Sequence, residues 1–182
     1  IPSDEILPMY KFPPPGVTSS LTTTSTASTN STWTIGGADY GTGQYQAKFS
    51  QDTSSTSVSA YHAFDENLTS GMESSSSSGI LTIHFPASRV IRKYVVWPVA
   101  EDGHRPSSWS LQASNDEVSW TNLHTVSGTP PNLSGNVYTT AVFGSYRHYR
   151  LNVTNTSGGM GVEVAELSLW GDVPLDTTPT FS

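Results

Sequence analysis

Oxygen-bearing side chains are concentrated in the segment AYHAFDENLTSG, residues 60–71, where they could bind a cation. Within six positions stand Asp65, Glu66, Asn67, Thr69 and Ser70. Carboxylates, amide carbonyls and hydroxyls are hard oxygen ligands that can hold a metal cation. The same residue types also form capped polar turns, in which side-chain oxygens accept hydrogen bonds from nearby backbone N–H groups. The residues alone leave both interpretations open.

A second polar segment, WPVAEDGHRPSSW at residues 97–109, combines hydrogen-bond donors with acceptors. Within five positions it carries Glu101, Asp102, His104 and Arg105. Such a set suits a sugar, whose hydroxyls take charge-assisted hydrogen bonds. A sugar also presents an apolar C–H face to an aromatic ring, and Tyr40 and Tyr45 in GGADYGTGQY could supply one.

Catalytic arrangements find little support in the sequence. The five histidines (His62, His84, His104, His124 and His148) lack a metal-binding spacing such as H-E-x-x-H, and we expect His84 and His124 to face water. There is no G-x-S-x-G nucleophile elbow, and the absence of cysteine excludes thiolate nucleophiles, zinc-thiolate sites and disulfides. Paired carboxylates for glycoside cleavage would have to come from Glu101, Asp102, Glu163 and Glu166. We therefore predict a non-catalytic protein.

Charge and composition restrict the partners. The 182-residue chain has a formal net charge of −7 and no basic tract, which argues against a nucleic-acid partner. No apolar run approaches the ~20 residues of a membrane span, so we expect no membrane insertion. Five of the eight asparagines stand in N-x-S/T sequons, an excess that suggests an extracellular, cell-surface or virion-surface glycoprotein: Asn30, Asn67, Asn132, Asn152 and Asn155.

Proline-rich segments flank a region of alternating hydrophobicity. Residues 1–16, IPSDEILPMYKFPPPG, carry five prolines and are predicted to form an extended arm or linker. Residues 17–171 are predicted to form the domain, although the Ser/Thr-rich part 17–32 could be a spacer or a polar strand. Residues 172–182 again have a linker composition. Linkers at both ends suggest a module joined to other modules or to copies of itself.

The region between the linkers alternates with a period of two residues, which is typical of β-strands. The runs are 79–85, 90–97, 108–114, 136–143, 148–153 and 164–170. In the fourth run the pattern assigns Val137, Thr139, Ala141 and Phe143 to one face. Helical periodicity is absent except for one possible turn at 59–64. We predict an all-β fold, a two-sheet sandwich. A hairpin should bring Trp109 and Trp120 close together in the core of the sandwich, and the alternative is a solvent-facing pair that stacks on sugars.

These runs, taken in order, resemble the discoidin or coagulation factor V/VIII type C domain, a galactose-binding-like group that includes many carbohydrate-binding modules. The resemblance covers residues from about 38 to 171. Its most specific parts are W-x-L-x-x-S-N-D-x-x-x-W, from Trp109 to Trp120, and the closing A-E-L-x-L-W-G. It implies an eight-stranded jelly-roll β-sandwich.

The resemblance also implies a structural Ca²⁺. Its ligands would be Ala63 through the backbone carbonyl and the side chains of Asp65, Asn67, Thr69 and Glu166. Glu166 lies far along the chain, so the ion would connect the two ends of the domain. Glu66 stands where the family usually has Gly, and a positive φ there would be costly for Glu.

For the ligand site, the resemblance implies loops at one rim of the sandwich, including NTSGGMG at 155–161. Galactose- and fucose-binding relatives commonly use His and Arg from such loops. The candidate ligand residues are Tyr40, Glu101, Asp102, His104, Arg105 and Gly159. We predict a lectin-like, glycan-binding adhesion module of an extracellular or virion appendage. The alternative is a structural repeat or a capsid or fibre subunit, whose arm packs on a neighbouring copy.

Overall fold

A computed structural model describes residues 9–13, 22–23, 30–35, 43–50, 60–69, 71–100 and 103–172. Tyr40, Glu101, Asp102 and most of both predicted linkers lie outside these ranges. Within them no helix has the length and apolar character that crossing a membrane requires.

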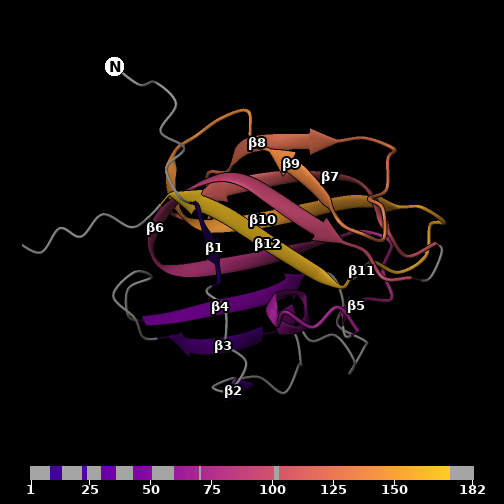
Figure 1. Cartoon of the computed structure of the whole chain (residues 1–182), viewed down its shortest axis with the longest axis horizontal. Coiled ribbons are helices and arrows are strands. Elements are labelled where there is room, and N and C mark those ends of the chain that lie inside the picture. The colour runs from indigo at the N-terminus through magenta and orange to yellow at the C-terminus, as the bar shows by residue number, and fades with distance from the viewer. Residues whose placement is uncertain are drawn as a thin grey trace, which may run out of the picture.

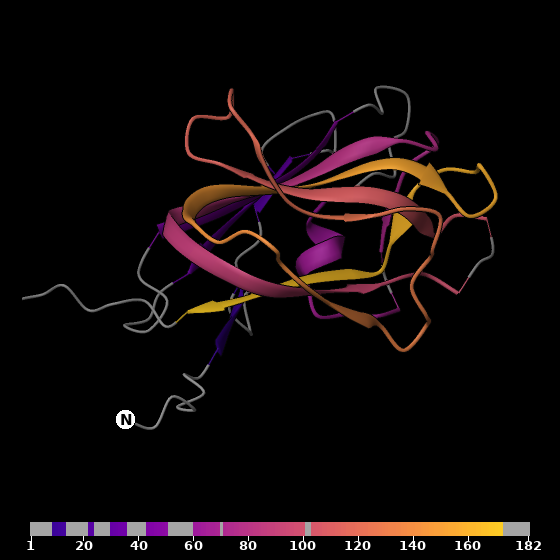
Figure 2. The same cartoon turned by 90° about the horizontal axis from the view of Figure 1, so that it is seen from above.

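A single long strand, β6 (Gly79–Trp97), belongs to both layers of a β-sandwich (Figures 1 and 2). Its first half pairs with β4 (Gly43–Ser50) and β10 (Ser145–Thr156), and its second half pairs with β12 (Glu166–Asp172) and β9 (Asn136–Thr139). The sequence predicted two strands here. The chain instead turns between the layers without leaving the strand, near the exposed Ala87 and Ser88.

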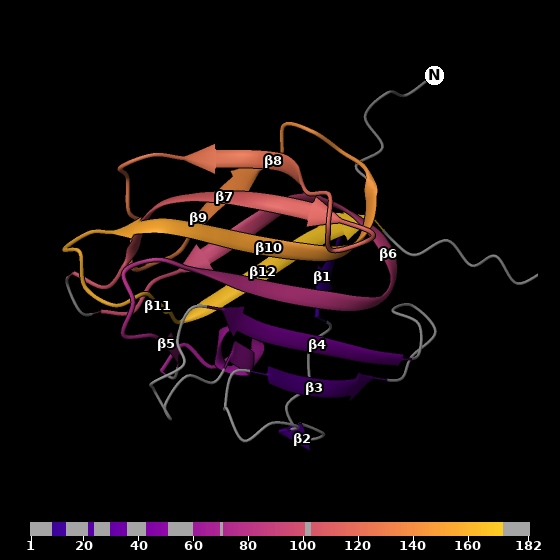
Figure 3. The same ribbon diagram turned by 180° about the vertical axis from the view of Figure 1, so that it is seen from behind.

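Within each layer, neighbouring strands run antiparallel. One layer follows the order β2-β3-β4-β6-β10-β7-β8, in which β2 is Thr22–Thr23, β3 is Asn30–Ile35, β7 is Pro106–Ser114 and β8 is Thr121–Val126 (Figure 3). The other contains β1 (Met9–Phe12), β12, the second half of β6, and β9. A small separate ladder joins β5 (Met72–Glu73) to β11 (Glu163–Val164), and a 3-10 helix, η2, spans Ala60–Phe64. The predicted all-β sandwich is confirmed, and the arrangement is consistent with a jelly roll.

Alternation decides which side chains enter the core. Leu81, Ile83 and Phe85 of β6 are each 1% exposed, and Trp109, Leu111 and Ala113 of β7 are equally buried, as the period-two pattern predicts. The Trp109 indole N–H donates to the Tyr94 hydroxyl at 3.0 Å, so its polar atom is satisfied inside the core.

Trp120 is not beside Trp109. The β7–β8 register pairs Trp109 with Val126, whereas Trp120 precedes Thr121 at the other end of the hairpin. Trp120 is half-buried, and the Arg150 guanidinium lies 3.9 Å from its ring centroid. The prediction that the two rings meet was wrong because they lie at opposite ends of the paired strands.

The inward face of β9 also differs from the prediction. Val137 is 62% exposed and Phe143 is 53% exposed, while Tyr138 turns inward and stacks on Tyr94 with ring centroids 5.1 Å apart. A one-residue shift in phase reverses every side chain of a strand. Here the large aromatic ring, which buries more apolar area than Val, occupies the core face.

Residues 9–12, predicted to belong to an arm outside the domain, form part of the sandwich. They make β1, which pairs with β12 from Met9 opposite Asp172 to Phe12 opposite Leu169. Phe12 is fully buried, with its ring centroid 5.5 Å from that of Phe85. The predicted boundary between arm and domain at residue 16 was therefore wrong. The run PPP does not interrupt the strand, because it begins only after Phe12. Asp172, placed in the C-terminal linker, likewise ends β12.

Candidate functional site

Two loops meet at one end of the sandwich and are held together through their backbones. The N–H groups of Gly158 and Met160 both donate to the Gly103 carbonyl, at 3.1 and 3.2 Å, and Ser157 N–H donates to the Arg105 carbonyl at 2.9 Å. The Gly103 N–H donates to Ser157 Oγ at 3.2 Å. Glycine is required at this contact, because a Cβ on Gly158 would lie 2.6 Å from the Gly103 Cα.

The paired loops form a cleft of about 440 Å³ that is open to solvent. Its walls are Gly103, Arg105, Pro130, Ser157 and Gly158. Pro130 comes from a third connection, between β8 and β9, which is fixed by a hydrogen bond of 2.9 Å from Thr129 N–H to the Ser107 carbonyl. The cleft combines a guanidinium, a hydroxyl and backbone amides with the apolar ring of a proline.

Only some of the predicted ligand residues lie at this cleft. Arg105 lines it, and its Nη2 donates to the Ala100 carbonyl at 3.4 Å. Gly159 is exposed directly after the lining residue Gly158, in a left-handed conformation with φ of 68°. Tyr40, Glu101 and Asp102 lie outside the described residues.

His104 is not among the residues that line the cleft. Its Nδ1–H donates to the Gly161 carbonyl at 2.7 Å, and Nδ1 lies 3.4 Å from Oε1 of the buried Glu163. These contacts hold the loop that follows β10. Tyr45, the other suggested aromatic platform, is only 1% exposed, so its ring belongs to the core and cannot stack on a sugar.

Sequence reasoning missed Pro130, Ser157 and Gly158. Their types are common in any loop, and only the fold shows that three connections meet. The family resemblance did imply that the loop 155–161 lies at the same rim as the Arg105 loop.

The polar segment at residues 60–69 meets Glu166 as the resemblance implied. Glu66 N–H donates to Glu166 Oε2 at 3.1 Å, across 100 residues of chain. Ala63 is buried, and the Asp65 side chain is 8% exposed, with Oδ1 accepting from Asn67 N–H at 3.0 Å. The Asn67 amide oxygen in turn accepts from Thr69 N–H and Oγ1. Glu66 has a positive φ of 61°, the conformation for which Gly would be the usual residue.

Glu166 is a deeply buried carboxylate at this segment. The residue is 2% exposed, and its Oε1 accepts no hydrogen bond from any residue that the structure describes. Burial above all, with help from the carboxylates of Asp65 and Glu66, raises the pKa of Glu166 to about 8. Lys11 of β1 acts in the opposite direction and forms an ion pair with Glu66 at 3.0 Å. A buried carboxylate with an unsatisfied oxygen, near the carboxylates of Asp65 and Glu66, fits Ca²⁺ coordination.

Solved carbohydrate-binding modules share this fold at low sequence identity. A family 32 module of Clostridium perfringens NanJ, in complex with galactose, matches with a TM-score of 0.59 and 14% identity over 69% of this chain and 93% of that one. Another C. perfringens module, CpGH89CBM32-5 in complex with GalNAc-β-1,3-galactose, matches with a TM-score of 0.58 and 15% identity over 69% and 94%. A chitosan-binding module from Paenibacillus sp. IK-5 matches with a TM-score of 0.57 and 20% identity over 69% and 92%.

No protein-family profile and no curated protein sequence matches the chain. At these identities the structural likeness establishes the fold. The chain has the discoidin-type, galactose-binding-like β-sandwich fold of the family 32 carbohydrate-binding modules.

Proposed function

We propose that this chain is a non-catalytic carbohydrate-binding module that takes a galactose-like or fucose-like sugar in the cleft beside Arg105. The observation that carries the proposal is the cleft itself, where three loops of the sandwich place a guanidinium, a hydroxyl and a proline ring around one opening. Guanidinium N–H groups donate charge-assisted hydrogen bonds to sugar hydroxyls. The similar modules bound to galactose and to GalNAc-β-1,3-galactose support the same ligand class.

The openness of the cleft implies weak binding by one copy. A shallow site buries little of a monosaccharide, so we expect a Kd near 1 mM, or about −4 kcal/mol. Useful affinity would come from several copies or from partner modules on the same chain.

An extracellular, cell-surface or virion-surface setting fits this function. The side chains of Asn67, Asn132 and Asn155 are exposed, as attachment of a glycan requires. Asn152, in the middle of β10, is half-buried.

Assembly through the N-terminal arm, the alternative function, has less support. It requires the arm to reach a neighbouring copy. Residues 9–12 pair instead with β12 of their own chain, and Phe12 fills the core of the same sandwich.

We also propose that Ca²⁺ stabilises the module at the polar segment. Ala63, Asp65, Asn67, Thr69 and Glu166 would hold the ion through oxygen atoms. The ion would supply positive charge to the unsatisfied Glu166 oxygen and connect η2 to β12.

Titration with galactose followed by NMR tests the sugar site. Arg105→Ala should weaken binding by about 1.5–3 kcal/mol, the usual value of a hydrogen bond to a charged group, which would abolish measurable binding by one copy. Lys93→Ala is the matched control, since it removes a cation on β6 that lies over Trp170 outside the cleft. Full binding by Arg105→Ala, or equal loss in both variants, would refute the assignment.

A further inference from the structure

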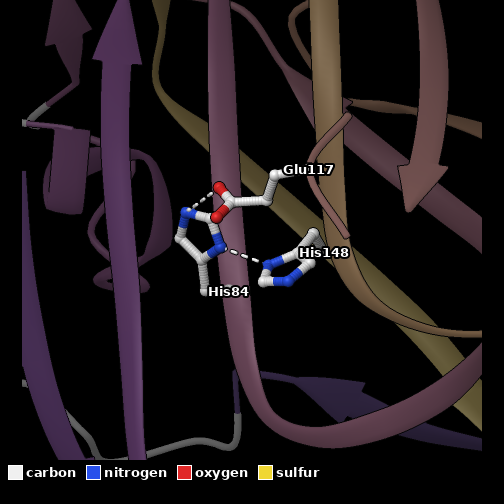
Figure 4. A group of neighbouring side chains, drawn as sticks. All are labelled: His84, Glu117 and His148. Carbon is white, nitrogen blue, oxygen red and sulfur yellow. Dashed lines mark hydrogen bonds and ion pairs between the residues drawn. The ribbon is translucent and has the colours of Figure 1, made fainter. Parts of the chain in front are cut away.

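Three potential metal ligands meet on the outer face of the β4-β6-β10-β7 layer, away from the cleft residues and the polar segment. They are His84 of β6, His148 of β10 and Glu117 of the β7–β8 hairpin (Figure 4). The β6–β10 register places His84 directly opposite His148. One ligand atom from each of the three residues lies within 4.8 Å of the others.

The polar atoms of this His84–Glu117–His148 cluster point toward one another. The two Nδ1 atoms of His84 and His148 are in hydrogen-bond contact, and His84 Nε2 lies 3.5 Å from Glu117 Oε1. Figure 4 shows contacts running from the two ring nitrogens of His84, one to the Glu117 carboxylate and the other to the His148 ring. Both histidines are only partly accessible, with 12% of the His84 side chain exposed. The prediction that His84 faces water was wrong, because its ring contacts the side chains of His148 and Glu117.

The hairpin fixes the position of Glu117. Ser114 Oγ accepts hydrogen bonds from Asp116 N–H at 3.2 Å and Glu117 N–H at 2.9 Å. Asp116 Oδ1 accepts from Val118 N–H at 2.9 Å and Ser119 N–H at 2.8 Å. Glu117 itself has a left-handed φ of 58°, which directs its carboxylate back over the sheet to the histidines. This carboxylate is therefore presented by an ordered turn.

The charges around the cluster allow a cation to enter. Burial lowers the pKa of His84 and of His148, with Lys48 and Arg147 contributing and the Glu117 carboxylate opposing the shift. Neutral imidazole is the form that ligates metals. The one cation in direct contact among the described residues is the Lys48 ammonium, 3.1 Å from Glu117 Oε1, and its side chain is 44% exposed. A metal ion could displace it into solvent.

We propose that His84, His148 and Glu117 form a binding site for one Zn²⁺-like divalent ion. Two imidazoles and one carboxylate are ligands that Zn²⁺ accepts at about 2.0–2.2 Å, and such three-residue sites leave the fourth tetrahedral position to water. Ligand atoms in a tetrahedral site lie about 3.3 Å apart, so side-chain rotations would bring the three ligand atoms, which lie within 4.8 Å of one another, around an ion. Imidazole ligands favour Zn²⁺ over Ca²⁺, which separates this site from the oxygen-rich polar segment.

Calorimetric titration of the metal-stripped full chain with ZnCl₂, in buffer containing millimolar CaCl₂, tests the proposal. We expect one equivalent of Zn²⁺ to bind. Glu117→Gln and His148→Gln should each weaken the affinity at least tenfold. Two variants serve as matched controls and should bind as the parent does: Glu73→Gln, which removes an exposed carboxylate, and His124→Gln, which removes a histidine outside the cluster.

Substitution with Co²⁺ gives an independent readout. The visible absorption bands of Co²⁺ should have the intensity of a four-coordinate site in the parent and should disappear in His148→Gln. Glu117 is exposed on a hairpin, so Glu117→Gln should leave thermal denaturation of the metal-free protein unchanged. Absence of Zn²⁺ binding at 100-fold excess, or equal affinity in the cluster variants and the parent, would overturn the proposal.

Discussion

Removing the Phe12 side chain tests whether β1 is part of the domain. Phe12 is fully buried near Phe85 and lies opposite Leu169 in the β1–β12 pair. Arg89 covers the other side of the ring, 5.9 Å from its centroid. Phe12→Ala would leave a cavity beside Phe85 in the core.

The expected loss is large for a domain of this size. Truncation of a buried Phe to Ala typically lowers the free energy of unfolding by about 3–5 kcal/mol, through lost transfer energy and the remaining cavity. At about 2–4 °C for each kcal/mol, the melting temperature should fall by about 6–20 °C.

Urea denaturation followed by tryptophan fluorescence measures the change, with the midpoint and the slope fitted separately. Phe143→Ala is the matched control, because it makes the same chemical change at a ring that is 53% exposed and contacts the Arg92 guanidinium. It should cost less than about 1 kcal/mol.

Two truncations extend the test. Deletion of residues 1–8 should preserve stability, whereas deletion of residues 1–13 should destabilise the domain at least as much as Phe12→Ala. Equal midpoints for the full chain and the longer deletion would refute the assignment of β1 to the sandwich.

Two further predictions concern polar loops. Chelation of Ca²⁺ should lower the melting temperature, because an ion bound only by the native state adds RT ln(1 + [L]/Kd) to stability; Asp65→Ala should abolish this response to chelator, and a melting curve insensitive to chelator would argue against the ion. Hydrogen bonds from Ser119, Val118 and Ser114 lower the pKa of Asp116. The stability that the Asp116 carboxylate gives the β7–β8 hairpin is therefore fully present above the pKa of the unfolded state, and it is lost as the pH falls through the lower pKa of the folded state. The protection factors of the Val118 and Ser119 amides, which compare the observed exchange rate with the intrinsic rate at the same pH, should therefore fall on acidification, and Asp116→Ala should show low protection factors at every pH; protection factors unchanged by acid would contradict this.

The alternation of apolar and polar residues correctly predicted which strand side chains enter the core. Leu81, Ile83 and Phe85 enter the core in phase because one face of a half-buried strand must be apolar. Trp109 was identified as a core residue for the same reason. The phase of β9 was not predictable in this way, since Val137 and Tyr138 are both good strand residues and only the stacking on Tyr94 selects the inward one.

Other features depend on contacts between distant segments. The sequence of β1 lies in a segment with the composition of a linker. It is a strand only because it pairs with β12. His84 and His148 stand 64 positions apart and show no ligand spacing, yet the β6–β10 register makes them neighbours. Pairing across a sheet brings together residues whose separation in sequence carries no signal.

The segment 163–166 contacts both the loop of the candidate cleft and the polar segment. Glu163 N–H donates to the His104 carbonyl at 3.0 Å, in the loop that carries Arg105, and Ala165 N–H donates to the Trp97 carbonyl at 2.9 Å, where that loop begins. At its other end, Glu166 accepts from the backbone of Glu66 in the polar segment. Four consecutive residues therefore connect both sites through backbone or buried contacts. An ion that orders Glu166 would restrict the same strand that supports the Arg105 loop, and preorganising that loop reduces the entropy lost when a sugar binds.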